Sequence, residues 1–322
     1  MRYDESWHPA VLITGADGYI GTALHQFLSD KVRTLDRFPH DVRDWNAWES
    51  LEDAHYDWVL HFAGLNNVPE SFNSPDEFLD VNVFGTDNAF RYANDHADGI
   101  IYASSLLAND WSKSPYAMTK RMTEVLQEMH SGNAIGVRIG TIWPGKPSSF
   151  YNKVLNDEIE EVEGLDSRDF IHVDDVVSAI WTIMTNTEQE MPRGMDIGSG
   201  VAITLNEICV ALDKEVKVNM GGTPQIQADI SWLTERGWKP QNHIMNWSAI
   251  PDLEKTGIGQ AKGITNIRVE EYMKETYASA GYDSPHGFFA PKDIEYNKKG
   301  QRITGHTETT GKKRNWNRDG DE

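Results

Sequence analysis

One tyrosine, Tyr116, is followed four residues later by a lysine, Lys120, and no other tyrosine of the chain has a lysine at this spacing. Residues four apart on a helix lie on one face, so the two side chains would sit together. The ammonium group, with an oxidised nicotinamide, would stabilise a phenolate and lower the pKa of the tyrosine. The phenolate could then remove a hydroxyl proton while hydride leaves the same carbon for the nicotinamide. The pair therefore predicts acid–base chemistry coupled to hydride transfer.

A serine hydroxyl that holds the reacting oxygen would complete such a site. Ser104 and Ser105 end the apolar run 100–103, which has the length and composition of a buried strand. Either serine could supply the hydroxyl. The helix that carries Tyr116 follows this strand in the sequence, which favours a functional role for the Tyr-x-x-x-Lys pattern over a chance occurrence.

A glycine-rich segment between a predicted strand, 10–14, and a helical pattern, 20–28, has the form of a phosphate-binding turn. Its glycines have the spacing G-x-x-G-x-x-G, which allows a tight turn, close approach of the backbone to a pyrophosphate, and helix–sheet packing. The helix N-terminus adds N–H groups and a partial positive charge. The residues predicted to bind the cofactor here are Gly15, Asp17, Gly18, Tyr19, Ile20 and Gly21.

An acidic residue, Asp36, ends the next apolar run, 32–35, and lies twenty-one residues after Gly15. Dinucleotide-binding folds place a carboxylate at about this distance to bind the ribose hydroxyls. It accepts a hydrogen bond from the 2′-hydroxyl and repels a 2′-phosphate, so the sequence favours NAD. Arg37 could instead pair with that phosphate, which keeps NADP as the alternative.

Apolar runs and helical patterns alternate along the chain. The predicted strands are 10–14, 32–35, 58–62, 100–103 and 134–139, and the predicted helices are 20–28, 76–94, 116–130 and 174–185. This alternation is typical of a parallel sheet covered by helices on both faces. The expected fold class is therefore α/β, a Rossmann-type doubly wound parallel sheet with a smaller C-terminal substrate lobe.

Proline and glycine at 144–147 suggest a domain boundary. We expect an NAD-binding domain over 1–147, to which helix 174–187 returns, and a substrate-binding lobe over 148–282. The last segment, 283–322, is polar and has few aliphatic residues, which predicts a mobile tail.

Composition narrows the class of protein. A formal net charge of −20 disfavours nucleic acid as a partner. The single cysteine, Cys209, lies in an apolar stretch and is interpreted as a buried hydrophobic residue, and no cluster has metal-ligand spacing, so we expect no metal. No apolar run is long enough to span a membrane and no signal-peptide pattern begins the chain, so a cytoplasmic protein is expected.

Over about residues 10–240 the sequence resembles the extended short-chain dehydrogenase/reductases, the NAD-dependent epimerase/dehydratase group. The matching segments are 14–21, 41–44 (DVRD), 61–64 (HFAG), Ser71, 82–86 (NVFGT), 102–105 (YASS), 116–120 (YAMTK), Arg138, 168–175 (RDFIHVDD), 228–230 (ADI) and 237–238 (GW). They follow one another in the order typical of the family.

The resemblance implies roles for individual residues. Ser105 aligns best with the serine that holds the substrate oxygen, Tyr116 and Lys120 are catalytic and also contact the cofactor, and Arg168 is a candidate ligand of substrate phosphate. Further cofactor-binding residues are implied at Asp41, Val42, Phe62, Ala63, Gly64 and Asn82. The resemblance also implies a homodimer that pairs through the helices at 76–94 and 116–130. His61 and His172 are interpreted as packing residues.

The sequence departs from parts of the family pattern. Leu106 and Leu107 stand where the sugar dehydratases have Asp-Glu, which disfavours elimination of water. An asparagine expected shortly after Arg138 and a second arginine upstream of Asp229 are absent. We therefore expect an epimerase or reductase of nucleotide sugars, with a dehydrogenase of a free sugar or sugar acid, similar to uronate dehydrogenases, as the alternative. A non-catalytic NAD-sensing scaffold is a third hypothesis.

Overall fold

The computed structural model describes residues 8–32, 34–51, 54–130, 132–186, 191–224 and 227–244, together with two short strands near the C-terminus. The chain forms two compact units, Met1–Ile250 and Pro251–Glu322. In the second unit β12 (Glu295–Tyr296) pairs antiparallel with β13 (Arg302–Ile303). The rest of the predicted tail, 283–322, lies outside the described residues.

The first unit is built on a six-stranded parallel sheet with the order β2-β1-β3-β4-β5-β9. Its strands are β1 (Ala10–Thr14), β2 (Thr34–Phe38), β3 (Trp58–His61), β4 (Ile100–Ser105), β5 (Ala134–Ile139) and β9 (Gly194–Ile197). The strand order reverses direction between β1 and β3. In doubly wound sheets, ligands bind at the carboxyl ends of the strands on either side of such a reversal. The predicted fold class is confirmed.

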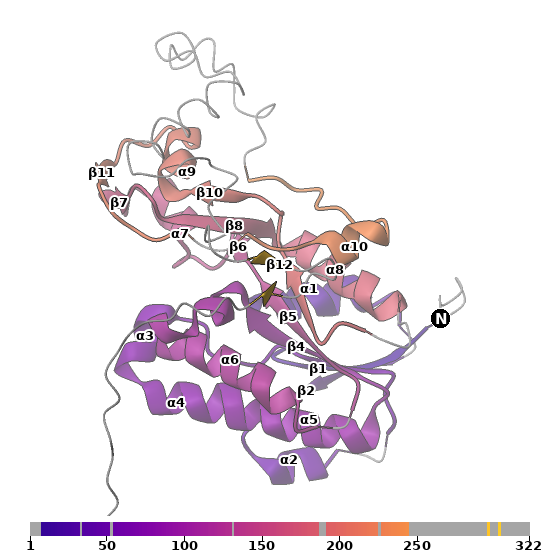
Figure 1. Cartoon of the computed structure of the whole chain (residues 1–322). Coiled ribbons are helices and arrows are strands. Elements are labelled where there is room, and N and C mark those ends of the chain that lie inside the picture. The colour runs from indigo at the N-terminus through magenta and orange to yellow at the C-terminus, as the bar shows by residue number, and fades with distance from the viewer. Residues whose placement is uncertain are drawn as a thin grey trace, which may run out of the picture. The chain divides into compact units, whose positions relative to one another are not determined.

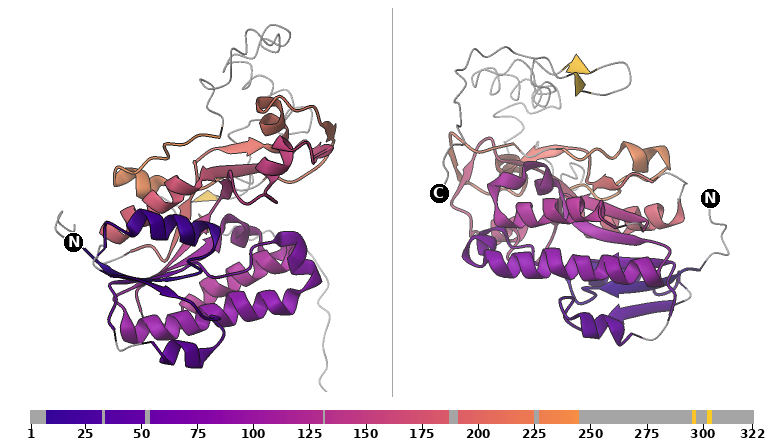
Figure 2. Two further views of the ribbon diagram at one scale, coloured as in Figure 1. Left: turned by 180° about the vertical axis from the view of Figure 1, so that it is seen from behind. Right: turned by 60° about the horizontal axis from the view of Figure 1, so that its bottom comes forward.

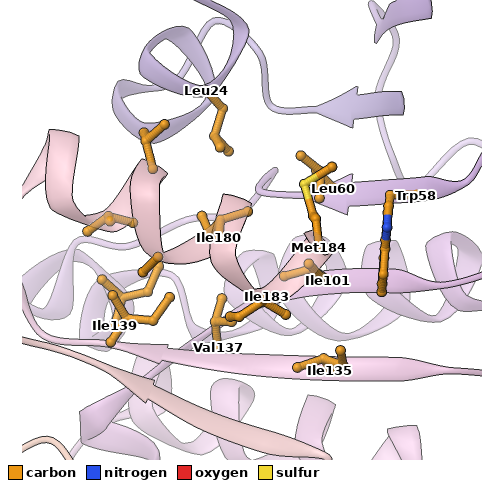
Figure 3. Packing of buried hydrophobic residues seen from close by; sticks show 14 of the residues in the cluster. Leu24, Trp58, Leu60, Ile101, Ile135, Val137, Ile139, Ile180, Ile183 and Met184 are labelled. Atoms are coloured by element: carbon orange, nitrogen blue, oxygen red, sulfur yellow. The ribbon is translucent and has the colours of Figure 1, made fainter. Parts of the chain in front are cut away.

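Helices cover both faces of this sheet (Figures 1 and 2). One layer contains α1 (Tyr19–Leu28), α8 (Val173–Thr185) and α10 (Ser231–Glu235). The other contains α2 (Trp45–Glu49), α5 (Gly85–His96) and α6 (Pro115–Gln127). Figure 3 shows the α1–α8 side of the core, where Leu24, Ile180 and Met184 pack against strand residues such as Leu60 and Val137.

The helix predicted over 76–94 is not continuous. It consists of α4 (Pro75–Leu79), a π-helical turn η1 (Asp80–Phe84) and α5, and it follows α3 (Val68–Asn73). A 3₁₀ segment, η2 (Leu106–Lys113), connects β4 to α6. Turns of π-helix occur frequently at functional sites, and Asn82, a predicted cofactor ligand, lies in the middle of this one.

A smaller lobe carries the remaining elements. Its strands form a β10-β8-β6 sheet and a β11-β7 pair, around a small core of their own. The elements are β6 (Thr141–Trp143), α7 (Phe150–Leu155), β7 (Glu161–Glu163), β8 (Ser167–His172), β10 (Ala202–Thr204), α9 (Leu205–Ala211) and β11 (Lys217–Asn219). Cys209 is buried in this core, as expected.

Two elements differ from the sequence-based assignment of 148–282 to the smaller lobe. β9 is the edge strand of the large sheet, and α10 belongs to the layer that covers it. The cause is apolar burial, because Met195, Ile197 and Leu233 join the same core as α8. Within the described residues, no helix is long and apolar enough to cross a membrane.

Candidate active site

The glycine turn lies at the strand-order reversal and is held against the loop after β3. The amide of Phe62 donates to the carbonyl oxygen of Thr14 at 3.2 Å, and the amide of Ala63 donates to the Thr14 hydroxyl at 3.3 Å. Gly15 has a φ of +69°, and a Cβ there would lie 2.5 Å from the Ala63 nitrogen. The close approach of these two loops therefore requires glycine at position 15.

The other two glycines have the roles that their spacing predicts. A Cβ on Gly21 would overlap the carbonyl oxygen of Gly15, so the third glycine permits the close packing of α1 on the turn. Gly18 is the N-cap of α1, and no side chain caps this helix end. An uncapped helix N-terminus behind a glycine turn suits a pyrophosphate, so the local geometry fits a dinucleotide cofactor.

Asn82 organises the loop that follows β3. Its Oδ1 accepts from the Leu65 amide at 2.8 Å, and its Nδ2 donates to the Leu65 carbonyl at 3.0 Å and to the Thr119 hydroxyl at 3.0 Å. A Cβ on Gly64 would lie 3.0 Å from Asn82 Oδ1 and 3.5 Å from Lys120 Nζ. The structure thus brings Gly64, Asn82 and Lys120 together, three residues that were predicted to bind the cofactor.

Ser105, Tyr116 and Lys120 meet beside the end of β4. Ser105 is the last residue of that strand, and its hydroxyl lies near enough to the Tyr116 phenol to lower the pKa of that group. Tyr116 lies in the first turn of α6, a helix that begins after the cap Ser114, whose hydroxyl accepts from the Ala117 amide at 3.1 Å. Lys120 follows one turn later, and its Nζ donates to the Ala103 carbonyl at 2.8 Å. The Lys120 Nζ is 5.9 Å from the centroid of the Tyr116 ring.

Burial governs the titration of this pair. It raises the pKa of Tyr116, an effect that the hydrogen bond from Ser105 opposes. It also lowers the pKa of Lys120 to about 8. The sequence predicted a lowered tyrosine pKa, and without a bound cofactor the direction is the opposite. The physical reason is that a buried phenolate loses its hydration. A pKa below the ordinary value would require added positive charge, such as that of a bound oxidised nicotinamide.

Ser104, the alternative serine, points to the opposite side of β4. Its hydroxyl donates to Glu124 Oε1 at 2.7 Å, and the same carboxylate accepts from Arg138 Nε at 2.7 Å and from Arg121 Nη1 at 2.8 Å. These hydrogen bonds hold the pKa of Glu124 below its usual value despite its burial. Ser104 is therefore part of a buried ionic network between α6 and β4, and Ser105 alone of the two contacts Tyr116.

The segment 41–44 (DVRD), in which the resemblance implies the cofactor-binding residues Asp41 and Val42, is well packed. The Val42 side chain is buried against Gly85, and its carbonyl accepts from Trp48 Nε1 at 2.9 Å and Asn88 Nδ2 at 3.0 Å. Asp41 pairs with Arg43, which lowers the pKa of the Asp41 carboxyl. At the predicted ribose-reading positions, Asp36 and Arg37, the structure describes the backbone only, so their side-chain roles remain predictions.

Arg168 lies on β8 of the smaller lobe. Its guanidinium carbon is 5.6 Å from the centroid of the Phe150 ring, and burial lowers its pKa, an effect that the nearby Asp166 charge opposes. Within the described part of the chain, no hydrogen bond or ion pair holds this guanidinium. A carboxylate at salt-bridge distance would be the structural explanation for this arginine, and none lies there among the residues that the structure describes.

The two histidines have structural contacts. The His61 ring interacts with the hydroxyls of Thr14 at 2.8 Å and Thr86 at 3.1 Å, and burial lowers its pKa to about 3. His172 is the N-cap of α8, where its Nδ1 accepts from the Asp174 amide at 3.2 Å. In the described ranges, no three His, Cys, Asp or Glu residues are grouped so that they could hold a metal ion.

Sequence reasoning missed two buried polar centres. One is Glu124, whose four-residue spacing from Lys120 was a visible signal that both face the same strand. The other is Asp169, whose carboxylate accepts from the amides of Ser199, Gly200 and Ala228 and so ties three loop positions to β8. No sequence signal pointed to the Asp169 contacts, because its partners lie 30 or more residues away.

Comparison with known proteins agrees with this arrangement. Residues 11–198 match the model of the NAD dependent epimerase/dehydratase family. The chain belongs to this family. The predicted family is confirmed, and with it the expectation of an NAD-dependent enzyme of the epimerase/dehydratase type.

Individual members of the family are distant relatives. A UDP-glucose 4-epimerase from Halalkalibacterium halodurans is 22% identical over 74% of this chain and 95% of its own length. A Thermus thermophilus UDP-glucose 4-epimerase in complex with NAD has a TM-score of 0.60 and 19% identity over 73% of this chain and 94% of its own. The Pseudomonas aeruginosa protein RMD in complex with NADPH has a TM-score of 0.62 and 22% identity over 73% and 95%. At this identity the solved structures show a shared fold.

Proposed function

We propose that this enzyme moves hydride between NAD and a sugar carbon of a nucleotide-linked sugar, as an epimerase or a reductase. The observation that carries the proposal is the cluster of Ser105, Tyr116 and Lys120 at the end of β4, with Lys120 beside Gly64. When bound, NAD supplies the hydride acceptor and donor. The cluster supplies groups that can hold and transfer a proton at the reacting oxygen.

Each of the three side chains has a distinct task in this proposal. The Ser105 hydroxyl binds the reacting oxygen of the sugar, and the Tyr116 phenol oxygen takes its proton during oxidation and returns it during reduction. Lys120 holds the ribose of the nicotinamide and favours the phenolate electrostatically. The low exposure of Tyr116 (8%) and Lys120 (6%) supports this division, because a buried pair excludes water from the proton transfer.

For the cofactor, we propose a preference for NAD over NADP, read by Asp36. A carboxylate at the end of β2 would accept from the ribose 2′-hydroxyl and repel a 2′-phosphate. Titration of the protein with both cofactors tests this. Tighter binding of NADP would instead assign the position to Arg37, and Asp36→Ala would then change the affinities little.

For the substrate, we propose that Arg168 binds a phosphate of the nucleotide. Its half-buried guanidinium, which no carboxylate pairs among the described residues, supports this role. The relatives named as UDP-glucose 4-epimerases favour a nucleotide sugar over a free sugar.

The experiment has two arms. NAD-loaded protein is incubated with a panel of nucleotide sugars and free sugars or uronic acids, with nicotinamide absorbance and epimer formation as readouts. Thermal stabilisation by millimolar UDP, GDP or dTDP is measured in the wild type, in Arg168→Ala and in the control Arg193→Ala, an exposed arginine paired with Glu128. We expect stabilisation that only Arg168→Ala reduces. Reaction of a free sugar or uronate without any nucleotide effect would favour the alternative dehydrogenase, and no reaction at all would favour the NAD-sensing scaffold.

We further propose a homodimer that pairs through α5 and α6. α6 and the turn that follows it expose an apolar stripe whose members, Met118, Met122, Val125 and Met129, are 42%, 39%, 56% and 79% exposed. Light scattering of the purified protein tests this, with Val125→Glu as the variant expected to shift the mass towards the monomer. A wild-type protein that stays monomeric at high concentration would contradict it.

A further inference from the structure

A hydrogen bond joins the glycine turn to the loop that leads from β6 to α7. The Tyr19 hydroxyl accepts from the Gly145 amide at 3.2 Å, across 126 positions of sequence. Tyr19 is the first residue of α1, and Gly145 follows β6, the first strand of the smaller lobe. The contact therefore connects the predicted cofactor site with the lobe that is expected to bind substrate.

The loop on the Gly145 side is internally fixed. Asn152 donates from Nδ2 to the carbonyls of Pro144 at 3.1 Å and Lys146 at 2.9 Å, and the Ser149 hydroxyl donates to Pro144 at 2.7 Å. Gly145 has a φ of +74°, and a Cβ there would lie 2.8 Å from that of Ser149. Because these bonds tie the loop to α7, a change in the position of the Gly145 amide would shift residues 144–149 together.

On the Tyr19 side, the position of the hydroxyl depends on the first turn of α1. No side chain caps this helix at Gly18, so the turn lacks the stabilisation that a capping residue usually provides. A pyrophosphate at the helix N-terminus would supply it through the backbone N–H groups and the helix dipole. Occupancy of the turn would thus favour the conformation in which Tyr19 reaches Gly145.

We propose that Tyr19 is a positioning residue that makes the placement of the loop 144–149 depend on cofactor occupancy of the glycine turn. The inference rests on NAD binding at that turn, as proposed above. Such coupling is reciprocal, because a ligand can shift an equilibrium only by its differential affinity for the two states. NAD fixes the loop through Tyr19, and the fixed loop in turn strengthens NAD binding.

Hydrogen exchange of the full-length protein, with and without saturating NAD, tests the proposal. In the wild type we expect NAD to slow exchange in peptides covering 14–21 and also in those covering 144–149. Tyr19→Phe keeps the ring and removes the acceptor, so NAD should still protect 14–21 but no longer 144–149. The control Tyr151→Phe removes a hydroxyl on α7 that takes no part in the Tyr19–Gly145 bond, and should behave as the wild type.

A second readout covers the possibility that a variant perturbs the fold. Tyr19→Phe and Asn152→Ala should each weaken NAD binding about twofold to tenfold, the effect of one hydrogen bond, and the double variant should weaken it no further. NAD-dependent protection of 144–149 that survives in Tyr19→Phe would overturn the inference, as would protection of 14–21 alone in the wild type. If NAD fails to protect 14–21 at all, the proposed cofactor site itself is wrong.

Discussion

Helices α6 and α8 cover opposite faces of the same parallel sheet, and their buried sides have opposite chemistry. α8 buries aliphatic side chains, including Val176, Ile180 and Ile183. α6 buries hydroxyl, amide and charged side chains: Tyr116, Thr119, Lys120, Thr123, Glu124 and Gln127. One face of this sheet therefore stabilises the fold by apolar burial. On the other face, directional polar contacts set the position of α6 and with it the Ser105–Tyr116–Lys120 cluster.

The contacts of α6 explain how it does so. Lys120 is bonded to the Ala103 carbonyl and Glu124 to the Ser104 hydroxyl, so two successive turns of the helix are attached to two successive residues of β4. Ser105 is the next residue of that strand. A register shift between α6 and β4 would break both bonds, whereas an aliphatic interface such as that of α8 tolerates small repacking.

The largest effect on stability should follow from Glu124→Gln. The substitution keeps the size of the side chain but removes the carboxylate that is hydrogen-bonded to the partly buried Arg138, which keeps only the longer contact with Asp196 at 3.7 Å. Breaking a buried ion pair costs roughly 3–5 kcal/mol. Denaturant unfolding measures the change. Glu128→Gln, at the C-cap of the same helix and in an exposed pair with Arg193, should cost about 0–1 kcal/mol. Equal losses of unfolding free energy in the two variants would mean that the polar network does not hold α6 on β4.

A pH-dependent effect should follow from Lys120→Met. The folded-state pKa of Lys120, about 8, lies below the ordinary value of 10.5, so burial of the ammonium destabilises the native wild type below pH 8. That penalty disappears as pH rises from about 8 to 10.5, because the unfolded chain then still binds a proton that the folded chain has lost. The free energy of unfolding of the variant minus that of the wild type should therefore be higher at neutral pH than above pH 10.5. The expected difference is on the order of 3 kcal/mol.

Unfolding free energies of both proteins at several pH values measure this difference. A gap between variant and wild type that stays constant from pH 7 to 10 would show that the Lys120 pKa is not lowered in the folded protein. Loss of the bond to Ala103 shifts the gap by an equal amount at every pH, so it does not hide the trend.

The smallest effect should follow from Ile180→Val on α8. Removal of one buried methyl(ene) group typically costs about 0.5–1.5 kcal/mol, and turnover and NAD affinity should not change, because Ile180 packs on the face of the sheet opposite α6. Denaturant unfolding and cofactor titration check both parts. A loss of NAD affinity in this variant would show that the two faces are not independent.

The sequence predicted α8 and α6 with unequal success. The apolar period of α8 identifies its buried side, since aliphatic residues pack on an aliphatic sheet face. In α6 and the turn after it, the apolar period marks the exposed side instead, with Met118, Met122, Val125 and Met129. Periodicity alone could not reveal this, because the strand residues under α6 are Tyr102, Ser104 and Arg138, which require polar partners.

The candidate site was predictable where local sequence fixes it. The glycine turn depends on neighbouring residues, and the Tyr-x-x-x-Lys pair on one helix turn. What escaped prediction depends on contacts between distant segments, such as Asn82 with Leu65, Asp169 with Ala228, and Tyr19 with Gly145. The edge strand β9 escaped for the same reason, since its four residues join the sheet only after the chain has traversed β6, β7 and β8.

The central claim is that the polar face of α6 delivers a proton-transfer group, Tyr116, to the reacting oxygen. The most direct test is the turnover number of Tyr116→Phe with a substrate found in the sugar panel. Removal of a general acid–base group should lower turnover about 100- to 10,000-fold, while NAD affinity and unfolding free energy stay close to wild type, because the ring remains packed. Turnover within a few-fold of wild type would contradict the account.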